Sequence, residues 1–160
     1  MLRMLKILLV ASMALMMTLA AIGNLTLPGN GFEAVKATVS MVGTKSQPEF
    51  MWRAITDESV IWFLWGLIVL GEALSALVCW LGSFRMLRAR KDVLTFNHSK
   101  ELALAGLGLM AFVYAFGWLT IANEWYLMYQ LPPEMNALPD AFRIAAIALL
   151  ILLFVNADDR

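Results

Sequence analysis

The feature that most constrains the fold is a run of twenty-five residues, 60–84, that is apolar except for one acid, Glu72. An α-helix rises about 1.5 Å per residue and the hydrocarbon core of a bilayer is about 30 Å thick, so about twenty apolar residues cross it. The sequence therefore predicts an all-α integral membrane protein with a single domain, 1–160, in which four transmembrane helices form a bundle. The expected helices lie at about 5–23, 60–84, 102–122 and 141–157.

The composition agrees with lipid as the solvent. Hydrophobic residues make up 61% of the 160 residues and charged residues 15%, against about 45–50% and about 25% in ordinary soluble domains. The single cysteine, Cys79, excludes an intrachain disulfide, and the single histidine, His98, excludes a haem held by two histidines of this chain. The sequence also contains no Gly-rich phosphate loop, H-E-x-x-H helix or G-x-S-x-G elbow. We therefore expect no metal site, no cofactor and no catalytic residues, and a protein that is not an enzyme.

The first and last helices are the shortest, and the first has an alternative interpretation. Arg3 and Lys6 precede an apolar run that ends in small residues, a pattern also typical of a cleaved secretory signal. We favour a retained helix, because nothing else in the chain looks like a secreted domain. In the last helix, Arg143 lies near the start and can extend its guanidinium to the interface, so this segment is also expected to span.

The basic residues predict the orientation. With four helices, eight Lys and Arg residues fall on the side of the two termini. The other side has four: Lys36, Lys45, Arg53 and Arg143. Basic residues concentrate in cytoplasmic loops, so both termini and the 85–101 loop are expected in the cytoplasm.

A basic cluster in this loop follows the second helix at once: Arg85, Arg88, Arg90 and Lys91. Such residues fix topology and attract anionic lipid, by about 1 kcal/mol each near the surface. Because short juxtamembrane clusters of this kind are routine, nucleic-acid binding is not expected.

The first outer loop is expected to contain two short interfacial helices. One begins at Asn30 or Gly31 and ends near Met41, and the other covers 49–55 after Pro48. Neither is long enough to be stable alone in water, so both are expected to pack on the helix ends at the interface.

Glu72 is the residue that most needs a partner. An acid at the centre of a transmembrane helix costs about 2.5–3.5 kcal/mol on insertion scales, so it should be neutral, paired or turned toward protein. A ridge of small residues at four-residue spacing lies beside it: Gly71, Ser75, Cys79 and Ser83. Such ridges let another helix approach closely. Two interpretations of Glu72 remain open, a proton or cation site and a structural hydrogen bond between helices.

A second candidate pair is Glu124 and Arg143, which close the third helix and open the fourth. An Arg–carboxylate fork there would tie the two helix ends together. The alternative function is an anion or headgroup site that uses Arg143 with Trp125.

Several motifs in order resemble those of one protein family. They are Met51-Trp52-Arg53-Ala54-Ile55-Thr56, Glu72-Ala73-Leu74, Phe96-Asn97, Glu124-Trp125 with Met128 and Gln130, Ala141-Phe142-Arg143, and the 151–155 run before an acidic tail. The chain resembles, over nearly its whole length, a bacterial family of predicted small integral membrane proteins, a domain of unknown function. The resemblance implies a bacterial inner membrane and an uncleaved first helix, and it implies no activity.

The chain departs from the family pattern after Gln130. A Trp-Asn-Gly-like turn is expected there, whereas this sequence reads Leu131-Pro132-Pro133-Glu134-Met135-Asn136. Whatever that loop binds in the family can therefore differ in this protein.

Three functions compete. The favoured one is a non-catalytic accessory or structural subunit that packs against a larger membrane complex, or a homo-oligomer. The alternative is an oligomeric small transporter or channel in which Glu72 is an intramembrane proton or cation site. The least favoured is a membrane enzyme that acts on lipid through Glu124 and Arg143, since a nucleophile and metal ligands are both missing.

Overall fold

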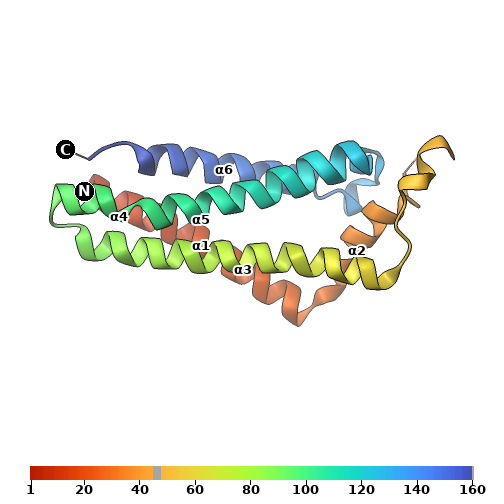
Figure 1. Ribbon diagram of the computed structural model, residues 1–160, viewed down its shortest axis with the longest axis horizontal. Coiled ribbons are helices and arrows are strands. Elements are labelled where there is room, and N and C mark those ends of the chain that lie inside the picture. Colours follow the sequence, from red (N-terminus) through yellow and green to blue (C-terminus); the bar gives the residue numbers. More distant parts are fainter. Residues whose placement is uncertain (45–47, 160) are drawn as a thin grey trace.

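Four long apolar helices make up the computed structural model, which describes residues 1–44 and 48–159 (Figure 1). The first is α1, Leu2–Thr26, and the second is α3, Glu58–Ala89. The third consists of α4, Val93–Ser99, then α5, Glu101–Phe112, and then the π-helix η2, Val113–Trp125. The fourth is α6, Leu138–Asn156. All four are long and apolar enough to cross a bilayer, so the predicted fold class is confirmed.

The first three long helices extend beyond the predicted bounds at both ends, and α6 begins three residues earlier than predicted, because polar residues at these ends are also helical. Asp57 caps α3, its side chain accepting a hydrogen bond of 3.1 Å from the amide of Val60. Asp92 caps α4 in the same way, at 2.7 Å from the amide of Thr95. Such caps satisfy the first free amides of a helix. The prediction from hydropathy ends a helix at the first charged residue, whereas the hydrogen-bonded helix continues into the interface.

Both short helices expected in the first long connection are present. They are α2, Pro28–Ser40, and the 3-10 helix η1, Pro48–Arg53. Pro28 is suited to the first turn of α2, where its missing N–H needs no partner. The last connection contains two 3-10 turns, η3, Met128–Gln130, and η4, Pro133–Met135.

The bundle has two distinct ends. One end holds both termini and the turn from α3 to α4, and we call it the terminal end (Figure 1). The other holds α2, η1 and the last connection, and we call it the α2 end. Lys45 and Arg160, which entered the charge count that predicts the orientation, lie outside the described residues.

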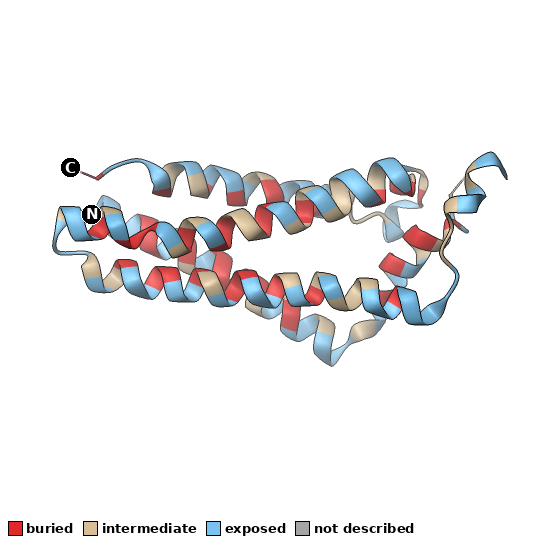
Figure 2. Ribbon diagram, in the orientation of Figure 1, coloured by how far each residue is buried: buried red, intermediate tan, exposed pale blue. Residues whose placement is uncertain are grey.

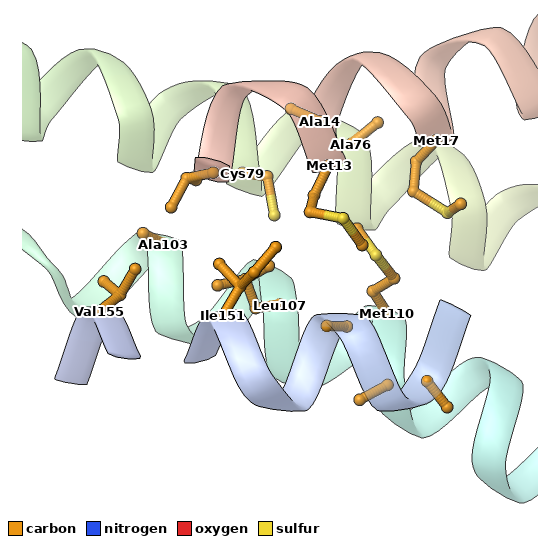
Figure 3. Close-up of a cluster of buried hydrophobic side chains, with 14 of the residues drawn as sticks. Met13, Ala14, Met17, Ala76, Cys79, Ala103, Leu107, Met110, Ile151 and Val155 are labelled. Atoms are coloured by element: carbon orange, nitrogen blue, oxygen red, sulfur yellow. The ribbon is translucent and has the colours of Figure 1, made fainter. Parts of the chain in front are cut away.

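The core is built from methionine and small side chains where the four long helices meet. This cluster contains side chains from all four long helices (Figure 3). Examples are Met13 of α1, Cys79 of α3, Leu107 of α5 and Val155 of α6. Buried residues recur along each long helix and alternate with exposed ones (Figure 2). Large apolar side chains are among the exposed residues, as Leu150 is at 65%. Outward apolar surface is what lipid requires, because lipid solvates it without cost.

Candidate functional site at the Glu72 cavity

Glu72 lies inside the bundle and is 5% exposed. Its Oε1 accepts a hydrogen bond of 2.8 Å from the hydroxyl of Tyr114, and its Oε2 accepts one of 2.8 Å from Nδ2 of Asn24. The carboxyl group therefore joins α3 to η2 and to the end of α1. The acid faces protein, as its position in the sequence led us to expect, but both of its partners are neutral.

A cavity of about 210 Å³ opens beside this carboxyl group. Its walls come from the end of α1, from α2, α3 and η2, and from the start of α6. The polar and aromatic residues that line it are Asn24, Trp65, Glu72, Tyr114, Trp118 and Asp140. The indole Nε1 of Trp65 is buried and has no hydrogen-bond partner. A buried donor without a partner is costly, so the cavity offers a place for an acceptor.

The cavity is lined by acidic but not by basic residues. Its lining contains two acids, Glu72 and Asp140, and among the residues that form it there is no Lys or Arg. The carboxylate of Asp140 is paired with Arg143, and that pair is largely exposed. Of these two acids, Glu72 is therefore the one that has only neutral partners in the described part of the chain.

The wall that carries Tyr114 is a π-helix. Its hydrogen bonds span five residues, as in the bond of 3.2 Å from the amide of Tyr126 to the carbonyl of Ile121. π-helical segments are rare and occur frequently at functional sites. Tyr114, the second residue of η2, continues the buried face that Leu107 and Met110 form on α5. Trp118, four residues later, lines the same cavity.

The small-residue ridge packs against helices of the same chain. A Cβ built on Gly82 would lie 2.4 Å from the backbone nitrogen of Ala103 in α5, and one built on Gly106 would lie 2.7 Å from the backbone nitrogen of Cys79. Gly71 faces Val113 in η2, while the hydroxyl of Ser83 donates to the carbonyl of Ile7 at 3.3 Å. Ser75 and Cys79 are fully buried. The predicted packing ridge is therefore occupied within the protein and provides no evidence for a partner chain.

The predicted fork between Glu124 and Arg143 is corrected by the structure. The guanidinium of Arg143 pairs with Asp140, three residues earlier in the first turn of α6, and donates to the carbonyl of Pro139 at 3.3 Å. Glu124 is exposed and accepts a hydrogen bond of 2.6 Å from its neighbour Asn123. Asp140 lies on the same helical turn as Arg143, so this pair forms within α6. A pair with Glu124 would also require the connection between η2 and α6 to hold the two helix ends together.

The basic cluster lies on the surface of the terminal end. Arg85, Arg88, Arg90 and Lys91 are exposed, with the guanidinium of Arg88 4.2 Å from the ring centroid of Phe84. The backbone carbonyl of Arg90 accepts a bond of 3.0 Å from Arg3. This arrangement is compatible with the expected contact to anionic lipid, which stays a prediction.

Sequence reasoning missed a buried charge cluster at the terminal end. The Nζ atoms of Lys6 and Lys100 both lie 2.8 Å from Oδ2 of Asp159, and the side chains of all three are at most 4% exposed. Both ammonium groups also donate to the carbonyl of Ala157, which follows the last turn of α6. Cations are favourable at a helix C-terminus. We call these three residues the terminal charge cluster.

Asn97 completes the attachment of the tail. Its side-chain oxygen accepts bonds of 2.7 Å from Nζ of Lys100 and 3.0 Å from the amide of Asp159. Burial raises the pKa of Asp159, but the hydrogen bonds and charges of Lys100 and Lys6 outweigh that effect and hold the pKa below its ordinary value. The signal available in the sequence was Lys6, which shares a helical face with the buried Val10 and Ala14.

The fold and the site together define a small multi-pass membrane protein with a buried carboxyl group, Glu72, beside a cavity inside the bundle and no group of three or more metal-ligating side chains within 1–44 and 48–159. The family model described as predicted small integral membrane protein (DUF2165) matches residues 2–158, and the chain belongs to this family. No curated protein and no solved structure matches the chain.

Proposed function

We propose that this protein is a non-enzymatic membrane protein that binds a small cation at Glu72. The observation that carries the proposal is a buried carboxyl group that faces a cavity and has only two neutral partners, Tyr114 and Asn24. An ionised carboxylate at this depth is costly unless a positive charge lies near it. A cation in the cavity would supply that charge.

The aromatic walls support a cation as the ligand. Trp65, Tyr114 and Trp118 all line the cavity. Ring faces attract positive charge by about 0.5–2 kcal/mol each, and more strongly where water is excluded. Carboxylate and aromatic faces together favour an ammonium group, whereas an anion would meet two acids.

Cation binding is tested with ammonium probes on the purified protein in nanodiscs of zwitterionic lipid. We expect methylammonium and ethanolamine to quench or shift tryptophan fluorescence with saturation, and Glu72→Gln to weaken binding at least about tenfold, or about 1.4 kcal/mol. The matched control is Glu58→Gln, the same change at an exposed residue on the same helix. Absence of saturable binding, or equal binding by Glu72→Gln, would contradict the proposal.

Transport would extend binding. An oligomer of this chain could carry the bound cation or a proton across the bilayer, with Glu72 as the group that is alternately occupied. Flux in liposomes that disappears in Glu72→Gln would support this extension. Binding without flux would leave a binding protein.

An accessory subunit of a larger membrane complex is the second candidate. It is favoured by an aromatic pair at the α2 end, where Trp52 is 71% exposed and lies 5.8 Å from Trp125, centroid to centroid. Exposed tryptophan is enriched where proteins associate and at membrane interfaces. Extraction in mild detergent should recover a defined partner with the wild type and less of it with Trp52→Ala; recovery of the single chain alone would argue against this role.

We further propose a bacterial inner membrane as the location, with both termini in the cytoplasm. The support is the excess of basic residues at the terminal end, including the exposed Arg85, Arg88, Arg90 and Lys91. Reporter fusions at residues 1 and 160 should both report the cytoplasm. A fusion in the connection between η2 and α6 should report the opposite side.

A further inference from the structure

We infer that the ligand of the Glu72 cavity is a single-chain amphipathic amine, whose ammonium head lies beside Glu72 and whose alkyl tail lies in a second cavity. This inference rests on the proposed function and specifies its ligand. It starts from an apolar cavity of about 400 Å³ beside α2, α3 and η2, which opens on the outer surface, since the lining residues Phe112 and Phe116 are exposed. Its lining is aliphatic and aromatic apart from Thr38, Tyr126 and backbone, and no charged residue takes part in it.

The two cavities are adjacent. Val35 of α2, Ile68 of α3 and Trp118 of η2 line both of them. The same three side chains thus lie at the boundary between the small polar cavity that contains the Glu72 carboxyl group and the larger apolar cavity. A ligand that contacts both spaces must have a short polar head and a long apolar part.

The head is specified by the groups of the Glu72 cavity. Glu72 has no basic partner among the residues described, so a positive charge is complementary to it. The indole N–H of Trp65 is buried without an acceptor, which a hydroxyl group next to the ammonium would provide. An ammonium with a neighbouring hydroxyl, as in ethanolamine, satisfies both conditions.

The tail is limited to one chain by the size of the apolar cavity. About 400 Å³ lies within the range of single small-ligand pockets. Gly117 marks its wall at a point where an added Cβ would meet no atom within 4 Å. A larger side chain at this position would therefore enter the space assigned to the tail.

The test measures binding of N-alkylethanolamines with butyl, octyl and dodecyl tails to the full chain in zwitterionic nanodiscs, corrected for partition into empty nanodiscs. We expect the corrected dissociation constant to fall at least about tenfold from butyl to dodecyl, because burial of methylene groups is favourable. Gly117→Leu should remove most of this gain, because the leucine side chain would occupy the space assigned to the tail. Gly66→Leu is the matched control, since Gly66 also has open space around it and lines neither cavity.

The outcomes separate this inference from the proposed function. Binding that depends on Glu72 but not on tail length would overturn the amphipathic ligand and leave the cation site intact. A gain with tail length that survives Gly117→Leu, or equal binding of dodecyl sulfate, would also overturn it, because the apolar cavity would then be ordinary lipid-facing surface. If no amine binds and Glu72→Gln changes nothing, both proposals fail.

Discussion

Two sites with buried carboxyl groups, one at the terminal end and one at Glu72 near the middle of α3, differ in how the protein compensates the acid. In the terminal charge cluster, Asp159 has two ammonium groups at 2.8 Å, and each ammonium also meets the carbonyl of Ala157. At the other site, Glu72 receives two hydrogen bonds from neutral groups and borders a cavity of about 210 Å³. A cavity of about 580 Å³ borders Asp159 as well, so the two sites differ in charge pairing rather than in space: the chain itself supplies cations to Asp159 and only neutral donors to Glu72.

This contrast gives a physical reason to assign a structural role to one site and a binding role to the other. Buried ions that are fully paired hold segments together, and removal of one partner leaves an uncompensated charge. A buried carboxyl group with only neutral donors is incompletely compensated, and such groups in membranes are functional candidates. The terminal charge cluster is therefore interpreted as a latch for the C-terminal tail, and the Glu72 site as a binding site.

The largest effect is expected from opening the latch. Asp159→Ala leaves Lys6 and Lys100 buried without an anion, and loss of one partner of a buried pair costs about 3–5 kcal/mol. The free energy of unfolding in detergent micelles should fall by that amount. Asp158→Ala is the matched control, because Asp158 is exposed and should change stability by less than about 0.5 kcal/mol. Similar stability of both variants would show that the cluster is not a latch.

A smaller effect is expected from the helix contact that lies between the two sites. Gly82→Ala places a Cβ 2.4 Å from the backbone nitrogen of Ala103, so α3 and α5 must separate. Overpacking of this kind costs about 1–3 kcal/mol. Gly66→Ala, at an open position of the same helix, should be neutral or slightly stabilising.

Gly82→Ala also tests whether the packing of α3 on α5 affects ligand binding at Glu72. Gly82 lies ten residues from Glu72, about 15 Å along the helix, and effects at that separation usually add. Ethanolamine affinity should therefore stay within about threefold of the wild type. A loss comparable to that in Glu72→Gln would mean that the packing of α3 on α5 controls the binding site.

Protonation of Asp159 at low pH should change the free energy of unfolding by less than these substitutions do, because a protonated Asp159 keeps some of its hydrogen bonds. Its folded pKa lies below the ordinary value, so the unfolded chain binds the proton more tightly. The stabilisation is complete above the unfolded pKa of about 3.9 and is lost as pH falls through the lower folded pKa. The difference in unfolding free energy between wild type and Asp159→Asn should be constant from about pH 7 to 5 and shrink below about pH 4. A difference that shrinks near neutral pH would assign the effect to another group.

The positions of the four long helices and the burial of Glu72 could be predicted from the sequence. Lipid thickness sets the length of a spanning segment, so the run 60–84 could be recognised without knowledge of its neighbours. An acid in that run must avoid lipid, so its inward direction also followed from the residue type alone. Helix ends were placed too short because Asp57 and Asp92, as caps, extend α3 and α4 beyond the apolar runs.

The partners of these charges could not be derived from the sequence. Lys6 and Asp159 are 153 residues apart, and an acidic tail usually indicates solvent. Tyr114 continues the buried face of α5, but which residue of α3 its hydroxyl meets depends on how the two helices pack. Arg143 had two acids within plausible reach, and only the geometry of the first turn of α6 selects Asp140 over Glu124.

The smallest change in stability, and the sharpest comparison, is expected at Glu72. In Glu72→Gln the side-chain oxygen can still accept from the hydroxyl of Tyr114, and the amide of Asn24 can turn so that its oxygen accepts from the new NH₂ group. No hydrogen bond is lost and a costly buried acid is removed, so the free energy of unfolding should stay within about 1 kcal/mol of the wild type. The same variant should lose ethanolamine binding. If Glu72→Gln instead destabilises the protein as much as Asp159→Ala does, then Glu72 is a structural link between α1, α3 and η2, and the difference between the two sites disappears.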